Sequence, residues 1–174
     1  MHEHDRILIL DYGSQFTQLI ARRVREGRVY CEIHPAGRSL DWIRQWGAKG
    51  IVLSGGPASV YEEGVPTTDP GLLKLGVPIL GICYGMQLMT DIMGGDVRRS
   101  GHREFGHALV HMTGQTSEGF CLFSQVPTDL RVCASHGDDV ASVPPGFSVT
   151  ATGDTVPVAA MADPDRSLYG LLFH

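Results

Sequence analysis

The 174-residue chain lacks several features that would place it in a special class of protein. Its four cysteines have no C-x-x-C spacing, which argues against a zinc site. A net charge of −5 provides no basic surface for nucleic acid. The apolar runs are far too short to span a membrane, and no signal-like segment precedes the first predicted strand. We therefore expect a cytoplasmic protein, in a reducing compartment, that binds neither nucleic acid nor membrane.

A glycine-rich phosphate loop is also missing. Neither a P-loop nor a loop of the pyrophosphatase kind occurs anywhere in the sequence. The chain is therefore predicted to bind no ATP. Its composition, 43% hydrophobic and 19% charged, is that of one ordinary globular domain with a sizeable core.

The first half of the sequence alternates predicted strands and helices. Strands are predicted at 6–10, 29–33, 50–53 and 77–82, and the segments between and after them are predicted helices at 16–26, 39–46, 70–75 and 84–93. Such alternation predicts an α/β fold with a mostly parallel central sheet flanked by helices. The second half differs, because it predicts only short added strands, antiparallel to the rest, at 108–112, 130–134, 148–152, 156–162 and 169–173.

One cysteine stands where a nucleophile is expected. Cys83 lies between a buried apolar strand and an amphipathic helix, in the sequence Gly-Ile-Cys-Tyr-Gly. The flanking Gly81 and Gly85 allow the strand and helix backbones to approach closely, as in the nucleophile elbow that hydrolases build around serine. The N-terminus of the following helix favours thiolate over thiol. The alternative is a small, buried and inert cysteine.

Other polar segments follow predicted strands, at the sheet edge where α/β proteins bind ligands. Residues 54–57, Ser-Gly-Gly-Pro, could aim backbone N–H groups at a developing oxyanion, or form only a tight turn. Residues 135–138, Ser-His-Gly-Asp, follow the strand 130–134 and could equally be a turn with a surface histidine. His174 ends the last predicted strand, where a base for Cys83 is wanted, although a terminal histidine is often merely solvated.

Taken together, these segments resemble the class I (triad-type) glutamine amidotransferases, and most closely the amidotransferase domain of the GMP synthases. The matching segments, in the order of that family, are residues 11–22, 53–57, 81–87, 103–106 and 135–138. The resemblance covers essentially the whole chain. It implies a flavodoxin-like three-layer fold and hydrolysis of glutamine to glutamate and ammonia. The ammonia would pass to an ATP-pyrophosphatase (synthetase) domain that converts XMP to GMP.

The same resemblance assigns roles to individual residues. Cys83 matches the nucleophile and His174 the general base and acid, with the backbone N–H groups of Gly56 and Tyr84 as the oxyanion hole. The residues that match substrate-binding positions are Gly55, Gln87, Ser135, Gly137 and Asp138. No metal or cofactor is implied for this domain, since ATP and Mg would belong to the synthetase domain.

The chain departs from the family at His174. The family's motif continues with proline and then a glutamate that orients the imidazole, and neither is in this sequence. We therefore expect residues 1–174 to be an amidotransferase domain that stops just before the third triad residue, with the synthetase domain absent. Such a chain is expected to hydrolyse glutamine slowly or not at all by itself.

Three other interpretations remain open. A cysteine peptidase or chaperone with this elbow typically has histidine directly after the cysteine, where this chain has Tyr84. A serine-hydrolase-like esterase with cysteine substituted leaves the match of Gln87 unexplained. An inactive amidotransferase-like subunit that binds or regulates a synthetase is the third.

His102, His107 and His111 do not share one face of a strand, so we expect no metal site there.

Overall fold

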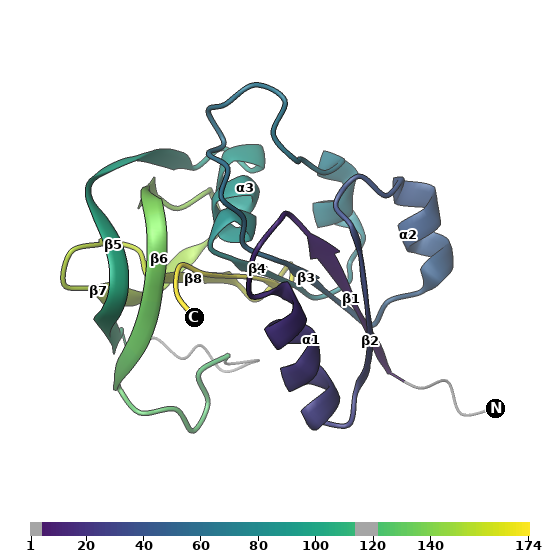
Figure 1. Ribbon diagram of the computed structural model, residues 1–174, viewed down its shortest axis with the longest axis horizontal. Helices are drawn as coiled ribbons and strands as arrows, with labels where there is room; N and C mark the ends of the chain where they lie inside the picture. The colour runs from purple at the N-terminus through teal and green to yellow at the C-terminus, as the bar shows by residue number, and fades with distance from the viewer. Residues whose placement is uncertain (1–4, 114–121) are drawn as a thin grey trace.

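The computed structural model describes residues 5–113 and 122–174, without the side chains of 102–104. Across these residues, nine strands form one sheet in the order β2-β1-β3-β4-β9-β8-β7-β5-β6 (Figure 1). The strands are β1 (Arg6–Asp11), β2 (Tyr30–Pro35), β3 (Gly50–Leu53), β4 (Ile79–Ile82), β5 (Asp96–Met112), β6 (Asp129–Ser142), β7 (Ser148–Gly153), β8 (Ala160–Asp163) and β9 (Leu168–Leu171). The helices are α1 (Thr17–Glu26), α2 (Leu40–Trp46), α3 (Tyr84–Ile92) and the 3₁₀ helix η1 (Pro70–Lys74).

The parallel part of the sheet lies between two layers of helices. Strands β2, β1, β3, β4 and β9 run parallel, as the apolar runs in the sequence predict. Ala21 of α1 packs on one face of these strands, with Ile9 and Val52. Helices α2 and α3 pack on the other face, where Leu8 and Leu10 point. Figure 1 shows this three-layer arrangement, which confirms the predicted fold class.

The antiparallel part differs from the prediction in the length of its strands. The pairs β9–β8, β8–β7, β7–β5 and β5–β6 are all antiparallel, as expected. However, β5 has 17 residues and β6 has 14, whereas the sequence predicted only residues 108–112 and 130–134 as strand. The last predicted strand before β9, at 156–162, is shifted to Ala160–Asp163.

One consequence is a correction for residues 135–138. They lie inside β6 rather than after the end of a strand at residue 134, and they belong to the part of β6 that pairs with β5. The prediction was wrong because Ser, His, Gly and Asp together are typical of turns. A register shift between Arg99 and Glu104 of β5 lets the two long strands continue pairing beyond this point. Ser135 and Gly137 are exposed, and the alternate residues His136 and Asp138 are buried.

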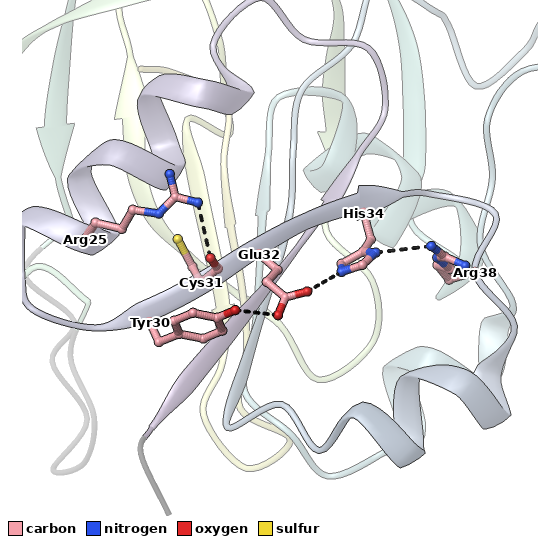
Figure 2. Close-up of polar contacts among 6 residues, drawn as sticks. All are labelled: Arg25, Tyr30, Cys31, Glu32, His34 and Arg38. Carbon is pink, nitrogen blue, oxygen red and sulfur yellow. Dashed lines mark hydrogen bonds and ion pairs between the residues drawn. The ribbon is translucent and has the colours of Figure 1, made fainter.

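The outer edge of the parallel sheet is protected by polar and aromatic side chains. In Figure 2, Tyr30, Glu32 and His34 project from the same face of β2 and are joined by hydrogen bonds. Arg38 contacts Nδ1 of His34, and since a guanidinium only donates, Nε2 of His34 carries the proton that it shares with Glu32. Hydrogen bonds from Tyr30 and then from His34 lower the pKa of Glu32. Charged groups on an edge strand discourage pairing with another chain.

Within the described ranges, every helix is too short or too polar to cross a lipid bilayer.

Candidate active site

Cys83 occupies a strained position at the junction of β4 and α3. Its backbone angles are φ 49° and ψ −110°, a region that non-glycine residues rarely adopt and that costs about 1–3 kcal/mol. Two hydrogen bonds hold it there: its N–H donates to Leu171 O at 2.7 Å, and its carbonyl oxygen accepts from the Gln87 N–H at 3.0 Å. The predicted strand–turn–helix elbow is therefore present, with the cysteine at its tip.

The two flanking glycines are required by close packing, as predicted. A Cβ atom on Gly85 would lie 2.4 Å from Leu53 O, and one on Gly81 would lie 2.7 Å from the backbone of Gly85. Real Cβ atoms essentially never approach other atoms below 3.0 Å. Helix α3 thus rests directly on β3 and β4, and this contact fixes the position of Cys83.

His174 lies beside Cys83, although the two residues are 91 positions apart in the sequence. Its Nε2 is 3.2 Å from Sγ of Cys83, within hydrogen-bonding reach. The His174 backbone exchanges two hydrogen bonds of 2.8 Å with Cys133 on β6, and its ring packs against Phe16 with 4.5 Å between centroids. Among the described residues, none places a carboxylate on the imidazole. The backbone pairing and the aromatic contact therefore hold the histidine in this structure.

Burial of the pair opposes the thiolate that the N-terminus of α3 is expected to favour. Cys83 is 4% exposed, and burial raises the pKa of its thiol from 9.0 to about 12. Burial likewise lowers the pKa of His174. Three pKa units correspond to about 4 kcal/mol, whereas a helix N-terminus contributes about 0.3–2 kcal/mol toward the thiolate. Burial therefore acts against the charged form of the thiol, and His174 Nε2, 3.2 Å from Sγ, lies where it can receive the thiol proton.

The two residues whose N–H groups are predicted to form an oxyanion hole, Gly56 and Tyr84, both line the cleft beside Cys83. Tyr84 is the first residue of α3, so its N–H has no acceptor within the helix. Gly56 lies in the segment after β3, where a Cβ atom would be 2.4 Å from Tyr12 O, so only glycine fits. A Cβ atom added to the neighbouring Gly55 would lie 3.4 Å from Cβ of Cys83. The segment 54–57 is therefore packed against the nucleophile, as its predicted role requires.

Gln87 and Asp138 form the next part of the site. Gln87 lies one turn past Cys83 on α3 and is 4% exposed. Its Nε2 donates a 3.0 Å hydrogen bond to the carbonyl oxygen of Asp138. The Asp138 carboxylate is itself held by the Ser59 hydroxyl, which donates to Oδ2 at 2.5 Å. These hydrogen bonds connect α3, β6 and the segment between β3 and η1.

A single cleft of about 820 Å³ collects all of the predicted site residues. The candidates that line it are Gly55, Gly56, Cys83, Tyr84, Gln87, Ser135, Gly137, Asp138 and His174. Ser135 and Gly137 are exposed residues of β6 that line the cleft, although the strand was expected to end at residue 134. The cleft is large enough for an amino acid and opens beside the nucleophile.

Several further residues line the cleft without having been predicted from sequence. Phe16 was predicted only as the first residue of the helix 16–26; it caps α1, and its contact with His174 has no local sequence signal. Ser59, Glu62 and Arg99 also line the cleft. Glu62 and Arg99 bring both signs of charge to it, and only the fold could show that these side chains converge.

Other residues considered from the sequence lie outside the cleft or outside the described residues. His111 is partly exposed and is hydrogen-bonded to two aspartates near the end of β5, Asp129 at 2.6 Å and Asp154 at 3.1 Å. Cys121 and the side chains of Arg103 and Glu104 lie outside the described residues. In the described part of the chain, no group of three or more His, Cys, Asp or Glu residues is arranged to hold a metal ion.

Comparison with known proteins decides the family. The model of the class-I glutamine amidotransferase family matches residues 8–174. The chain belongs to the class-I glutamine amidotransferases.

Similar sequences include enzymes named GMP synthase [glutamine-hydrolyzing]. The protein from Heliobacterium modesticaldum is 53% identical over 171 residues, which cover 98% of this chain and 33% of that protein. The one from Aromatoleum aromaticum is 51% identical over 176 residues, covering 98% of this chain and 34% of that protein. This amidotransferase chain thus spans about a third of the length of these relatives.

Solved structures agree with the fold. A GMP synthase subunit protein from Thermoplasma acidophilum is 30% identical, with a TM-score of 0.84 over 100% of this chain and 85% of the other. A glutamine amidotransferase from Thermotoga maritima, 24% identical, has a TM-score of 0.75 over 99% of this chain and 76% of the other. The second likeness concerns the fold alone.

Proposed function

We propose that this amidotransferase chain hydrolyses the side-chain amide of glutamine to glutamate and ammonia, with Cys83 as nucleophile and His174 as the group that moves the proton. The observation that carries the proposal is the 3.2 Å contact between Cys83 Sγ and His174 Nε2 at the tip of the elbow. A paired nucleophile and base is the arrangement that covalent catalysis of acyl transfer needs.

The first half of the reaction forms a thioester. As Sγ attacks the amide carbon, the thiol proton passes to Nε2 of His174, and the carbonyl oxygen becomes an oxyanion that accepts hydrogen bonds from the Gly56 and Tyr84 N–H groups. The protonated imidazole then donates its proton to the departing nitrogen. Ammonia leaves, and a glutamyl thioester remains on Cys83.

The second half regenerates the enzyme. His174, now neutral, takes a proton from water, and the resulting hydroxide attacks the thioester carbon. The carbon–sulfur bond breaks, the sulfur regains a proton from the imidazolium, and glutamate is released. Because burial favours the neutral thiol and the neutral imidazole, this return of the proton restores the resting state.

We further propose that the ammonia serves the amination of XMP to GMP in a synthetase domain or subunit. The support is the similarity to proteins named GMP synthase [glutamine-hydrolyzing], of which this chain matches about a third. The remaining two thirds of those relatives would supply the ATP-dependent chemistry, for which this chain has no phosphate loop.

A catalytically inactive subunit that binds or regulates the synthetase is the alternative. The absence of a carboxylate on the His174 ring among the described residues favours it, since an orienting acid contributes up to ~10⁴ in kcat in serine triads. Cysteine enzymes depend less on such an acid because a thiol ionises more readily than a hydroxyl. His174 Nε2 lies 3.2 Å from Cys83 Sγ, within reach of the thiol proton, which favours the active enzyme.

Ammonia release from glutamine tests the proposal. The unsubstituted chain should release ammonia slowly, since no described residue places a carboxylate on His174, and Cys83→Ser should lower that rate at least 100-fold. Cys31→Ser is the matched control: Cys31 is also buried, but it does not line the cleft, and its sulfur contacts Ala21 O, a contact that a serine hydroxyl can replace. Equal rates in the unsubstituted chain and Cys83→Ser would refute the mechanism. No ammonia from the unsubstituted chain, at any protein concentration, would favour the inactive subunit.

A further inference from the structure

Ser59 connects two walls of the cleft that are distant in the sequence. It lies in the long connection between β3 and η1, a few residues after the oxyanion glycine Gly56. Its hydroxyl donates a 2.5 Å hydrogen bond to Oδ2 of Asp138, 79 positions away on β6. Both residues line the cleft that holds Cys83. This contact is therefore part of the site rather than of the remote fold.

Asp138 is the point where this connection meets the rest of the site. Its carboxylate is held in the cleft wall with the residue only 8% exposed, and its carbonyl oxygen accepts the hydrogen bond from Gln87. No described residue other than Ser59 donates a hydrogen bond to the carboxylate. Oδ2 is thus occupied by the serine, while Oδ1 has no donor from the described protein. A charged oxygen in so confined a place is stabilised when a cation binds it.

We propose that Ser59 is a positioning residue that fixes the Asp138 carboxylate so that Oδ1 binds the α-ammonium group of an amino-acid substrate. This inference rests on the proposed function, in which that substrate is glutamine. An aspartate side chain without the serine contact can rotate about two bonds, and each alternative rotamer moves Oδ1 out of line with the substrate. A hydrogen bond that locks the rotamer makes the site ready before the substrate arrives.

The expected effect of removing the hydroxyl is on binding and not on chemistry. Ser59→Ala should raise KM for glutamine about tenfold, the typical consequence of losing one hydrogen bond to a charged group. The value of kcat should change less than about twofold, because Cys83 and His174 are not touched. Ser59→Thr keeps the hydroxyl and should restore KM to within about threefold. Thr67→Ala is the control, since it removes an exposed hydroxyl from the same connection.

A substrate without the ammonium group distinguishes two roles of Ser59: positioning the Asp138 carboxylate for the substrate, or only anchoring the segment between β3 and η1. Glutaric acid monoamide has the same amide and carboxylate as glutamine but lacks the α-amino group. The unsubstituted chain should prefer glutamine over this amide in kcat/KM. Ser59→Ala should lose about tenfold with glutamine and little with the monoamide, so the preference itself should fall. Alkylation of Cys83 by iodoacetamide, which has no amino-acid end, should proceed at an unchanged rate in Ser59→Ala.

The outcomes distinguish the inference from the function on which it rests. An equal loss with glutamine and with the monoamide, or a slower reaction with iodoacetamide, would show that Ser59 only anchors the loop, and would overturn the positioning role while the hydrolysis stands. An unchanged KM for glutamine in Ser59→Ala would overturn it as well. If the unsubstituted chain releases ammonia from neither amide, the proposed function itself fails, and this inference fails with it.

Discussion

Replacing Gly85 by alanine tests whether packing under the elbow fixes the nucleophile. The new Cβ would lie 2.4 Å from Leu53 O and 2.7 Å from Leu53 Cβ, both atoms of a fully buried strand residue. Since Cβ atoms need at least 3.0 Å, helix α3 or strand β3 must move by about 0.6 Å. The shift is transmitted directly to Cys83, two residues before Gly85.

Two opposing effects determine the size of the loss in stability. Alanine is favoured over glycine in a helix by about 1 kcal/mol. Overpacking of a rigid core typically costs about 1–3 kcal/mol and sometimes more, and here the obstructing atom is backbone. We expect Gly85→Ala to lower the free energy of unfolding by about 2 kcal/mol, which corresponds to a Tm about 4–8 °C lower in a protein of this size.

Activity should fall further than stability suggests. A displacement of 1 Å in a catalytic group can cost about 100-fold in rate, so a shift of about 0.6 Å is expected to lower the rate of ammonia release by about 10- to 100-fold. Thermal unfolding and a steady-state ammonia assay measure the two effects. Gly37→Ala is the control, because an added Cβ there meets no atom within 4 Å and should change Tm by less than about 2 °C. Unchanged Tm and activity in Gly85→Ala would refute the packing argument.

Three further predictions concern single groups. Burial raises the pKa of Cys83 to about 12, so the rate of its alkylation by iodoacetamide should keep rising above pH 9. At pH 7.5 this rate should be lower than that of the exposed Cys133. A rate that reaches its plateau below pH 7 would contradict this prediction. Tyr84→Phe removes the 2.7 Å hydrogen bond to Pro66 O and should lower the free energy of unfolding in urea by about 1 kcal/mol. An unchanged free energy of unfolding would show that this hydrogen bond does not stabilise the fold. Hydrogen bonds from its two aspartate partners raise the folded-state pKa of His111, so its contribution should be complete below pH 6.5 and fade as pH rises through the raised value. The Tm difference between the unsubstituted chain and His111→Gln should thus be larger at pH 5.5 than at pH 8.5, and a difference independent of pH would be inconsistent with this.

The parallel half of the fold could be predicted from the sequence because its signals are local. Apolar runs bounded by glycine or proline gave β1 to β4, and Ser39 caps α2 as its position before Trp42 suggests. The elbow around Cys83 could be predicted for the same reason, since its glycines, strand and helix are adjacent in the chain. Residues at the ends of parallel strands then met at one edge of the sheet, as the topology requires.

The remainder depends on contacts between distant segments. The long pairing of β5 with β6 could not be predicted, because the polar residues 135–138 have the composition of a turn and are extended only through their partner strand. The raised pKa of Cys83 follows from burial by the complete fold, which acts against the local effect of the helix. The contacts of Phe16 with His174, and of Ser59 with Asp138, join residues that no local pattern relates.

The central claim is that Cys83 forms a covalent thioester with the glutamyl group. Acid quenching during turnover with glutamine, followed by peptide mass spectrometry, tests it most directly. The account predicts that the peptide containing Cys83 gains the mass of glutamine minus ammonia, and that Cys83→Ala shows neither the adduct nor ammonia release. An adduct on another residue, or ammonia release from Cys83→Ala at the rate of the unsubstituted chain, would contradict it.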